Sequence, residues 1–265
     1  QLSASAYADL RHCPYRFYAL RQLGLQEQDE LEAELDKRDF GTWLHAVLQR
    51  FHEGLRDAPT RDAAERSARL DAAASQAREQ LGLAGSDFLP YASGWPQLRD
   101  GYLHWLDEHE AGGAQFAQAE VQAQQRLALG QGSLELVGKL DRIDEAKDAE
   151  GRAAALVIDY KTEGSQATRA RVQAGTEDTQ LAFYAALMPE GRGPLRAAYV
   201  NVGERGETRT FEAPDVEQLR DALLAGIRDD FDRIAQGAGL PALGEGSVCD
   251  WCAARGLCRK DFWNE

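Results

Sequence analysis

Apolar residues recur at helical spacing over much of the first 110 residues. Ser3 and Ser5 are candidate N-cap residues for a helix that runs to about Leu23, where Gly24 should end it. Pro14 lies inside this segment. Because proline lacks the backbone N–H that a helix interior uses, Pro14 should kink or restart the helix. We therefore expect a broken N-terminal helix.

Three further helices are expected before residue 112. Apolar residues at spacings of three and four predict an amphipathic helix over 38–55, at Leu44, Val47, Leu48, Phe51 and Leu55. The Ala- and Arg-rich segment 60–81 predicts a helix that is exposed on one side. The last helix, over 95–110, should turn large apolar residues inward, at Trp95, Leu98, Tyr102 and Trp105 or Leu106.

Near Gly112 the pattern changes from helical spacing to strands. Residues 116–129 and 133–143 predict a hairpin around a Gly-rich turn. The continuous apolar run 155–160 is typical of a strand buried on both faces. The remaining elements are expected as a loop at 145–152, helices at 176–188 and 215–236, and strands at 195–202 and 207–212.

This order of elements predicts an α/β fold, a mixed sheet flanked by helices with a helical N-terminal extension. We expect one domain over residues 1–265, divided into a mainly helical part (1–111), an α/β core (112–240) and a cysteine-containing segment (241–265). No apolar run approaches the roughly 20 residues of a membrane helix, and no secretory signal peptide opens the chain. We therefore expect a cytoplasmic protein.

The first residue is Gln1 and the only methionine is Met188. Either the chain is a domain excised from a larger protein, which we favour, or its natural N-terminus has been trimmed.

Charge limits the functions that the chain can perform. The 265 residues include 30 Lys and Arg against 44 Asp and Glu, a net charge of −14. This balance argues against nucleic-acid binding by bulk electrostatics, because neutralisation of phosphates dominates such binding. It remains compatible with an enzyme that holds a metal ion in a carboxylate site. The acidic run 26–36 is expected to be a solvated helix face or an exposed connection.

An acid and a lysine lie at the end of the buried strand. Asp159 and Lys161 are two residues apart and share one face of the strand. This pair is either a surface ion pair or part of a site for a metal ion and a nucleophilic water. Asp141, near the end of the preceding strand, favours the site, because Mg²⁺ in proteins is usually bound by one or two carboxylates. Glu120 is a third candidate carboxylate, whereas Asp144 is expected to pair with Arg142 or to cap a turn.

Two histidines and a Gln–Tyr pair complete the candidates. His45 lies beside the apolar stripe, four residues after Gly41, which would allow close approach of another group. His52 is about 10 Å further along the helix, at about 1.5 Å per residue, so both cannot bind one metal ion. We expect His52 on the surface. Gln180 and Tyr184 share a helix face and could hold a phosphate or a base, or could simply pack as a half-buried helix side.

The four cysteines are Cys13, Cys249, Cys252 and Cys258, with the spacing C-x235-C-x2-C-x5-C. Four thiolates suit an iron–sulfur cluster or a structural zinc ion, and free thiols are the remaining alternative. Zinc ribbons usually pair one CxxC with another, whereas here a single cysteine lies far upstream. The asymmetry favours a cluster that joins the two ends of the chain.

Taken in order, these motifs resemble the RecB-type PD-(D/E)xK nucleases. The matching segments are GTWLH with His45, VGKLDRID with Asp141, VIDYKT with Asp159 and Lys161, and QLAFY with Gln180 and Tyr184. The segment around Cys13 and the terminal CDWCAARGLC resemble the split iron–sulfur staple of the AddB-like subgroup. The unit Asp-Tyr-Lys replaces the Glu-x-Lys of many relatives, a form common in the RecB-type branch.

The resemblance implies a restriction-endonuclease-like sheet and a Mg²⁺- or Mn²⁺-dependent DNA nuclease, with a single-strand exonuclease favoured. It implies a helicase domain or subunit as partner, and a role in double-strand-break repair and recombination. His45, Asp141, Asp159 and the Tyr160 carbonyl would bind the metal ion, and Lys161 would act on the attacking water. Gln180 and Tyr184 would hold the DNA strand. The four cysteines would bind a structural 4Fe–4S cluster.

Two rival interpretations belong to other classes of function. One is a DNA-binding clamp whose nuclease site is inactive, and the other is a zinc-stapled interaction module.

Overall fold

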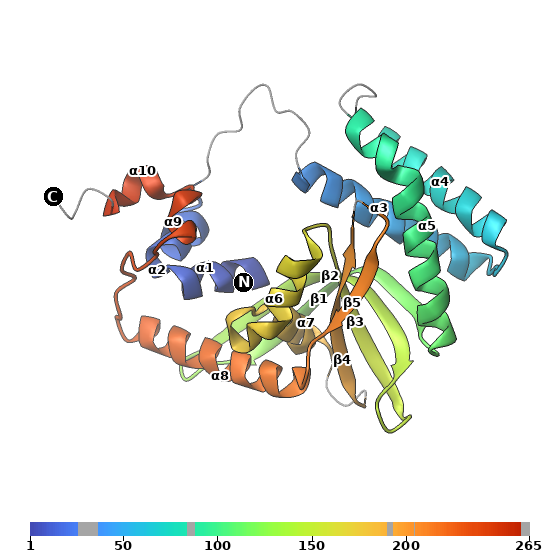
Figure 1. Cartoon of the computed structure of the whole chain (residues 1–265). Helices are drawn as coiled ribbons and strands as arrows, with labels where there is room; N and C mark the ends of the chain where they lie inside the picture. Colours follow the sequence, from blue (N-terminus) through green and yellow to red (C-terminus); the bar gives the residue numbers. More distant parts are fainter. Residues whose placement is uncertain (26–36, 84–87, 190–192, 204, 261–265) are drawn as a thin grey trace.

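A five-stranded mixed sheet forms the centre of the computed structural model, which describes residues 1–25, 37–83, 88–189, 193–203 and 205–260 (Figure 1). The strands lie in the order β1-β2-β3-β4-β5. Only β3 and β4 run parallel, and every other neighbouring pair is antiparallel. The strands are β1 (Gln115–Ala128), β2 (Ser133–Lys147), β3 (Ala153–Lys161), β4 (Leu195–Val202) and β5 (Thr208–Glu212).

Helices cover both faces of this sheet, which gives three layers (Figure 1). One apolar core lies between the sheet and α3, α4 and α5, and a second lies between the sheet and α1, α7 and α8. The expected α/β fold is therefore confirmed. The helices are α1 (Ala4–His12), α2 (Pro14–Phe17), α3 (Lys37–Asp57), α4 (Ala63–Gln80), α5 (Leu89–Ala111), α6 (Ser165–Gln173), α7 (Gln180–Leu187), α8 (Val216–Ala235), α9 (Ser247–Asp250) and α10 (Arg255–Cys258).

The N-terminal helix is broken where its sequence predicts. The Ser3 hydroxyl accepts a hydrogen bond from the Ala6 N–H, 3.2 Å away, and so caps α1. Cys13 adopts an extended conformation between the two helices, and Pro14 is the first residue of α2. Proline is favoured there because its missing N–H has no partner in the first turn of a helix. A π-helical turn, Tyr18–Gln22, follows.

Several boundaries differ from those expected. β2 continues to Lys147, so the predicted loop 145–152 shortens to 148–152. The helix expected at 95–110 begins at Leu89 and includes Pro96. The helix expected from residue 176 begins at Gln180, after a 3₁₀ turn at Gly175–Glu177. The acidic run 26–36 lies outside the described residues. Within the described part of the chain, no helix is both long and apolar enough to cross a membrane.

Close packing of α5 against the turn after β4 requires two glycines. A Cβ atom on Gly101 would lie 1.7 Å from the Gly206 carbonyl oxygen, which is a severe overlap. Gly206 has φ +81°, and a Cβ there would lie 2.6 Å from the Gln97 oxygen. The backbones of the helix and the turn therefore touch directly.

The sheet opens into a fork between β2 and β3. Their pairing runs from Lys147 opposite Ala153 to Arg142 opposite Ile158, and it stops there. β2 pairs with β1 from Ser133 to Glu145, apart from Asp141, whereas β3 continues beside β4 to Lys161. Asp141 and Asp159, the next residue on each strand, therefore lie at the point of the fork.

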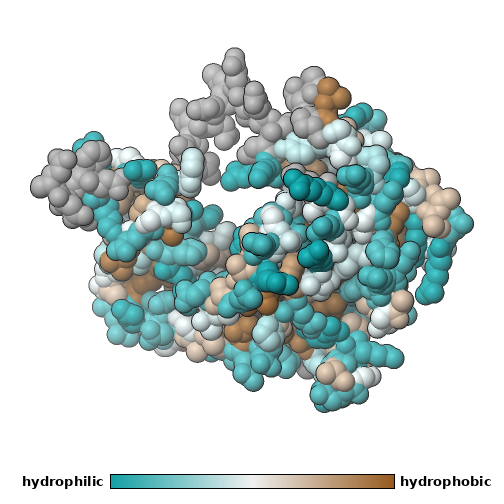
Figure 2. All heavy atoms as spheres, in the orientation of Figure 1, coloured by the Kyte–Doolittle hydropathy of each residue, from teal (hydrophilic) through white to brown (hydrophobic). Residues whose placement is uncertain are grey.

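Figure 2 draws one face of the whole molecule. That face is mostly polar, with apolar residues in scattered patches.

Candidate metal centre and cysteine cluster

Asp141 links the two strands where their pairing ends. Its Oδ2 accepts a hydrogen bond from the Tyr160 backbone N–H at 2.9 Å, which replaces the ladder bond that β2 no longer supplies. Asp141 and Asp159 are both buried, with 8% and 2% of their surface exposed. Two carboxylates from adjacent strands thus come together away from solvent, where an uncompensated negative charge is costly.

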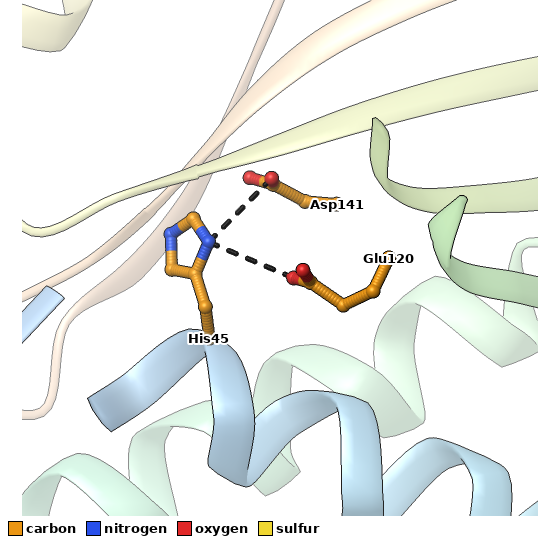
Figure 3. A group of neighbouring side chains, drawn as sticks. All are labelled: His45, Glu120 and Asp141. Carbon is orange, nitrogen blue, oxygen red and sulfur yellow. Dashed lines mark ion pairs between the residues drawn. The ribbon is translucent and has the colours of Figure 1, made fainter. Parts of the chain in front are cut away.

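His45 extends from α3 into the fork (Figure 3). Its Nδ1 lies 3.5 Å from Asp141 Oδ1 and 3.8 Å from Glu120 Oε1. Its Nε2 lies 3.3 Å from the Tyr160 carbonyl oxygen. Burial by itself lowers the pKa of this imidazole, but Asp141 and the neighbouring carboxylates outweigh burial and raise the pKa to about 9. A positive group is therefore strongly favoured at this position.

Glu120 is held in an unusual backbone conformation. It lies within β1 with φ +52°, in the left-handed region that non-glycine residues seldom adopt. Its side chain is only 10% exposed and forms ion pairs with His45 and Lys139. Such strain persists where surrounding contacts impose it, and it is concentrated at functional sites. Here it accompanies a carboxylate directed at His45 (Figure 3).

Asp159 and Lys161 form a second group beside the first. Lys161 Nζ lies 2.7 Å from Asp159 Oδ2 and donates to Gln180 Oε1 at 2.8 Å. Gln180 Nε2 donates to Asp159 Oδ1 at 2.7 Å and contacts the Tyr184 hydroxyl at 3.2 Å. Burial and the nearby Asp141 charge raise the pKa of Asp159 to about 7, although Lys161 opposes the shift.

The donor set fits a divalent cation. One ligand atom from each of His45, Glu120 and Asp141 lies within 4.8 Å of the others. In the described part of the chain, the buried Asp159 Oδ2 accepts no hydrogen bond of acceptable geometry, despite its proximity to Lys161. A cation would compensate the buried negative charge. Oxygen donors with one imidazole suit Mg²⁺ or Mn²⁺ better than softer metals.

The arrangement only partly matches the ligands expected from the sequence. His45, Asp141 and the Tyr160 carbonyl lie together, but Asp159 turns toward Lys161 and Gln180. Glu120 takes the third place in the tight group. The sequence indicated Glu120 only by its position on the strand before Asp141. No pattern in the sequence indicates its φ.

Three smaller expectations can also be checked. Asp144 pairs with Arg142, as predicted, at 2.6 Å. The prediction of a surface His52 is wrong, because the residue is only 2% exposed and bonded to Tyr102. Gly41 is not required for close approach, since an added Cβ would lie an ordinary 3.7 Å from Thr162.

The four cysteines lie around one pocket although 235 residues separate the first two. The terminal helices α9 and α10 lie beside α1 and α2, as the red and blue ribbons of Figure 1 show. No disulfide forms among the described cysteines. Arg16, Arg255 and Lys260 also line the pocket. The residues are Cys13, Cys249, Cys252 and Cys258.

Comparison with known proteins places this chain in a family. A model of the PD-(D/E)XK nuclease superfamily matches residues 1–259, and the chain belongs to that superfamily. One curated relative is a subunit of an ATP-dependent helicase/deoxyribonuclease from Desulforudis audaxviator (strain MP104C), 31% identical over 180 residues. That alignment covers 60% of this chain and 15% of the relative, so the chain spans a small part of that protein.

Two solved structures resemble the fold at lower similarity. One is a candidate exonuclease from Eubacterium rectale, with a TM-score of 0.45 and 14% identity, covering 97% of this chain and 86% of the other. The other is SSO0001, with a TM-score of 0.36 and 13% identity, covering 97% and 84%. Family membership therefore rests on the sequence match.

Proposed function

We propose that this chain is the nuclease domain of an AddB-like protein and hydrolyses phosphodiester bonds in DNA with the help of Mg²⁺ or Mn²⁺. The observation that carries the proposal is the cluster of His45, Glu120 and Asp141 next to the Asp159–Lys161 pair at the β2–β3 fork. The superfamily match supports nuclease chemistry at this position.

His45, Asp141 and Glu120 would hold the cation, and the Tyr160 carbonyl and Asp159 are further oxygen donors beside His45. A bound divalent cation would polarise a phosphate oxygen and lower the pKa of a water molecule. The protein contributes a fixed set of negative charges that requires a positive partner. Glu120 also holds Lys139, a half-exposed cation suited to a DNA phosphate at the edge of the site.

Lys161 would orient the attacking water and offset the negative charge that develops on the phosphate. Its ammonium is fixed by Asp159 and Gln180 and lies 5.0 Å from the centre of the Tyr199 ring. Gln180 bonds both Asp159 and Lys161, which gives it a role in holding the acid–lysine pair in addition to contact with DNA. Tyr184 extends the same polar surface.

We further propose that the domain acts as a single-strand exonuclease alongside a helicase in double-strand-break repair. The similarity to a helicase/deoxyribonuclease subunit supports this context. Its test is degradation of end-labelled single-stranded and duplex DNA with Mg²⁺. Shortening from one end is expected for the parent, whereas Asp141→Asn should leave the DNA intact. Asp229→Asn, an acid-to-amide change on the exposed side of α8, is the matched control and should retain full activity. Intact DNA with the parent would support the inactive clamp instead.

Cys13, Cys249, Cys252 and Cys258 would bind a structural 4Fe–4S cluster that fixes the C-terminal segment to α1 and α2. The shared pocket and the basic side chains around it support this assignment. Positive side chains offset the net negative charge of a thiolate-bound cluster.

We expect Cys252→Ala to lose the brown colour and the iron, and to melt at a lower temperature. Closing a loop of about 235 residues can stabilise a fold by several kcal/mol. Parent and variant would be purified without oxygen and compared by iron content and thermal melting. Zinc in the parent, or an equal melting temperature, would contradict the assignment.

A further inference from the structure

A second group of polar side chains is buried between the sheet and helices α3 and α5, one residue away from the metal centre along the strands. Its members come from two helices and two strands and are buried or nearly so. We call it the buried network, and it comprises His52, Tyr102, His109, Arg142, Asp144 and Tyr160.

An ion pair without solvent contact anchors the network. Arg142 and Asp144 have side chains 1% and 0% exposed, and the guanidinium donates to the two carboxylate oxygens at 2.6 and 2.8 Å. His109 Nε2 lies 2.7 Å from the same carboxylate. Two parallel hydrogen bonds fix the plane of the guanidinium as well as its position.

The remaining Arg142 nitrogen, Nη1, contacts three further members of the buried network. Its Nη1 lies 2.8 Å from His52 Nε2, 3.3 Å from the Tyr102 hydroxyl and 3.2 Å from the Tyr160 hydroxyl. The two tyrosine hydroxyls are 2.9 Å apart. Because arginine can only donate, His52 accepts through Nε2 and is neutral. Burial and the Arg142 charge lower the pKa of His52, which agrees with this assignment.

Three of the elements that supply the metal centre, α3, β2 and β3, also supply this network. Arg142 follows Asp141 on β2, and His52 lies two turns after His45 on α3. Tyr160 belongs to both groups. Its hydroxyl joins the network, its N–H donates to Asp141, and its carbonyl faces His45.

We propose that the buried network is a positioning frame that sets the distances between α3, β2 and β3, and so between the metal ligands. Apolar residues could fill this space, and buried ion pairs seldom add net stability over apolar packing. Directional hydrogen bonds differ from apolar contacts, because all of them form in only one alignment of α3, β2 and β3. Groups that orient metal ligands from outside the coordination shell typically change metal affinity by about 10- to 100-fold.

Tyr102→Phe is the sharpest test, because Tyr102 belongs to α5 and removal of its hydroxyl leaves every candidate ligand in place. The matched control is Leu98→Val on the same helix, a buried residue of the apolar core outside the network. Both variants are expected to melt somewhat below the parent. Two measurements separate them: the dissociation constant for Mn²⁺ and the exchange rate of the Tyr160 amide proton in the metal-free protein.

We expect Tyr102→Phe to weaken Mn²⁺ binding at least about tenfold and to accelerate exchange of the Tyr160 amide, with the control close to the parent in both. Tyr160→Phe should act in the same direction, and the double variant should lose less than the two single losses combined, because the two hydroxyls share one of their bonds. Equal amide exchange in Tyr102→Phe and Leu98→Val would overturn the proposal.

The Mn²⁺ measurement rests on the proposed function, whereas the amide measurement does not. A parent that binds no Mn²⁺, together with faster Tyr160 exchange in Tyr102→Phe, would reject the nuclease assignment and support the frame. A parent that binds Mn²⁺, with unchanged affinity and exchange in Tyr102→Phe, would reject the frame alone.

Discussion

The metal centre and the buried network use the same kinds of side chain on the same two strands, but their hydrogen bonding differs. All three guanidinium nitrogens of Arg142 and both oxygens of Asp144 are bonded. In the metal centre, three carboxylates surround one imidazole, and Asp159 Oδ2 accepts no well-formed hydrogen bond from the described residues. The network is complete as it stands, whereas the centre is completed by a cation.

The ionisable groups of the buried network and of the metal centre also differ in their pKa shifts. Burial raises the pKa of Tyr102 and Tyr160 and lowers that of His52, so these groups stay neutral at ordinary pH. In the metal centre the pKa of Asp159 is raised to about 7 and that of His45 to about 9, so both groups tend to hold a proton when no cation is bound. The shifts in the network favour the forms that its hydrogen bonds require, whereas those in the metal centre favour protons that a cation could replace.

The largest expected effect separates activity from stability at the metal centre. Asp141→Asn and Asp159→Asn should each lower metal-dependent cleavage by roughly 10³-fold or more, about 4 kcal/mol of activation free energy. Metal-free Asp159→Asn should melt at or above the parent temperature because a buried charge is removed, whereas Asp141→Asn also loses the charge that stabilises protonated His45 and should melt lower. Cleavage assays and thermal melts of the same preparations check this. Near-parental activity in both would remove the carboxylates from the mechanism.

Lys161→Ala should lower the cleavage rate by roughly 10²- to 10⁴-fold at saturating metal, the usual contribution of a group that assists proton transfer or charge compensation. Calorimetry should still detect metal binding. Lys139→Ala is the comparison, since it removes another cation from the edge of the site and should raise KM more than it lowers kcat. A Lys161 variant that loses metal binding would instead have a structural role.

A matched Asp-to-Asn substitution in the buried network should instead lower the stability of the fold. Asp144→Asn leaves the Arg142 charge without its partner, and breaking a buried pair in this way typically costs about 3–5 kcal/mol of folding free energy. Urea unfolding of this variant and of Asp159→Asn gives the contrast directly. If both lose the same stability, the distinction between a complete network and an incomplete centre is wrong.

Much of this organisation follows from local sequence. Ser3, Pro14 and the stripe from Leu44 to Leu55 predict their helices because capping, ring geometry and amphipathic spacing act over a few residues. The acids at 141 and 159 could be predicted to converge because they follow apolar runs on neighbouring strands. Local sequence does not predict that β2 continues to Lys147, or that α5 begins at Leu89 and includes Pro96, because tertiary packing decides both.

The error at His52 shows what local patterns miss. Its partners, Tyr102 and Arg142, are 50 and 90 residues away in the sequence. A helical wheel around Phe51 places His52 at the edge of the apolar stripe, where a histidine is usually solvated. Only the pairing of β2 with β1 brings Arg142 and Phe116 beside it. The φ of Glu120 is likewise not indicated by its neighbours in the sequence, and the residue lies at a gap in the pairing of β1 with β2.

The smallest effect expected is a pH dependence confined to the metal centre. The pKa of Asp159 is raised from 3.8 to about 7, and that of His45 from 6.5 to about 9. The folded protein therefore holds more protons than the unfolded chain across these intervals, so the stability of the metal-free protein falls as pH rises through them. The slope should reach at most about 1.4 kcal/mol per pH unit for each group.

A cation replaces the protons on Asp159 and His45, so the rise in melting temperature produced by Mg²⁺ should grow from pH 6 to pH 9. Asp159→Asn should flatten the part of this curve below about pH 7, whereas Tyr102→Phe should weaken Mg²⁺ binding across the range without changing the direction of the dependence. Thermal melts with and without Mg²⁺ measure both. A Mg²⁺ effect that shrinks with rising pH would mean that the metal ion does not compete with protons at His45 and Asp159.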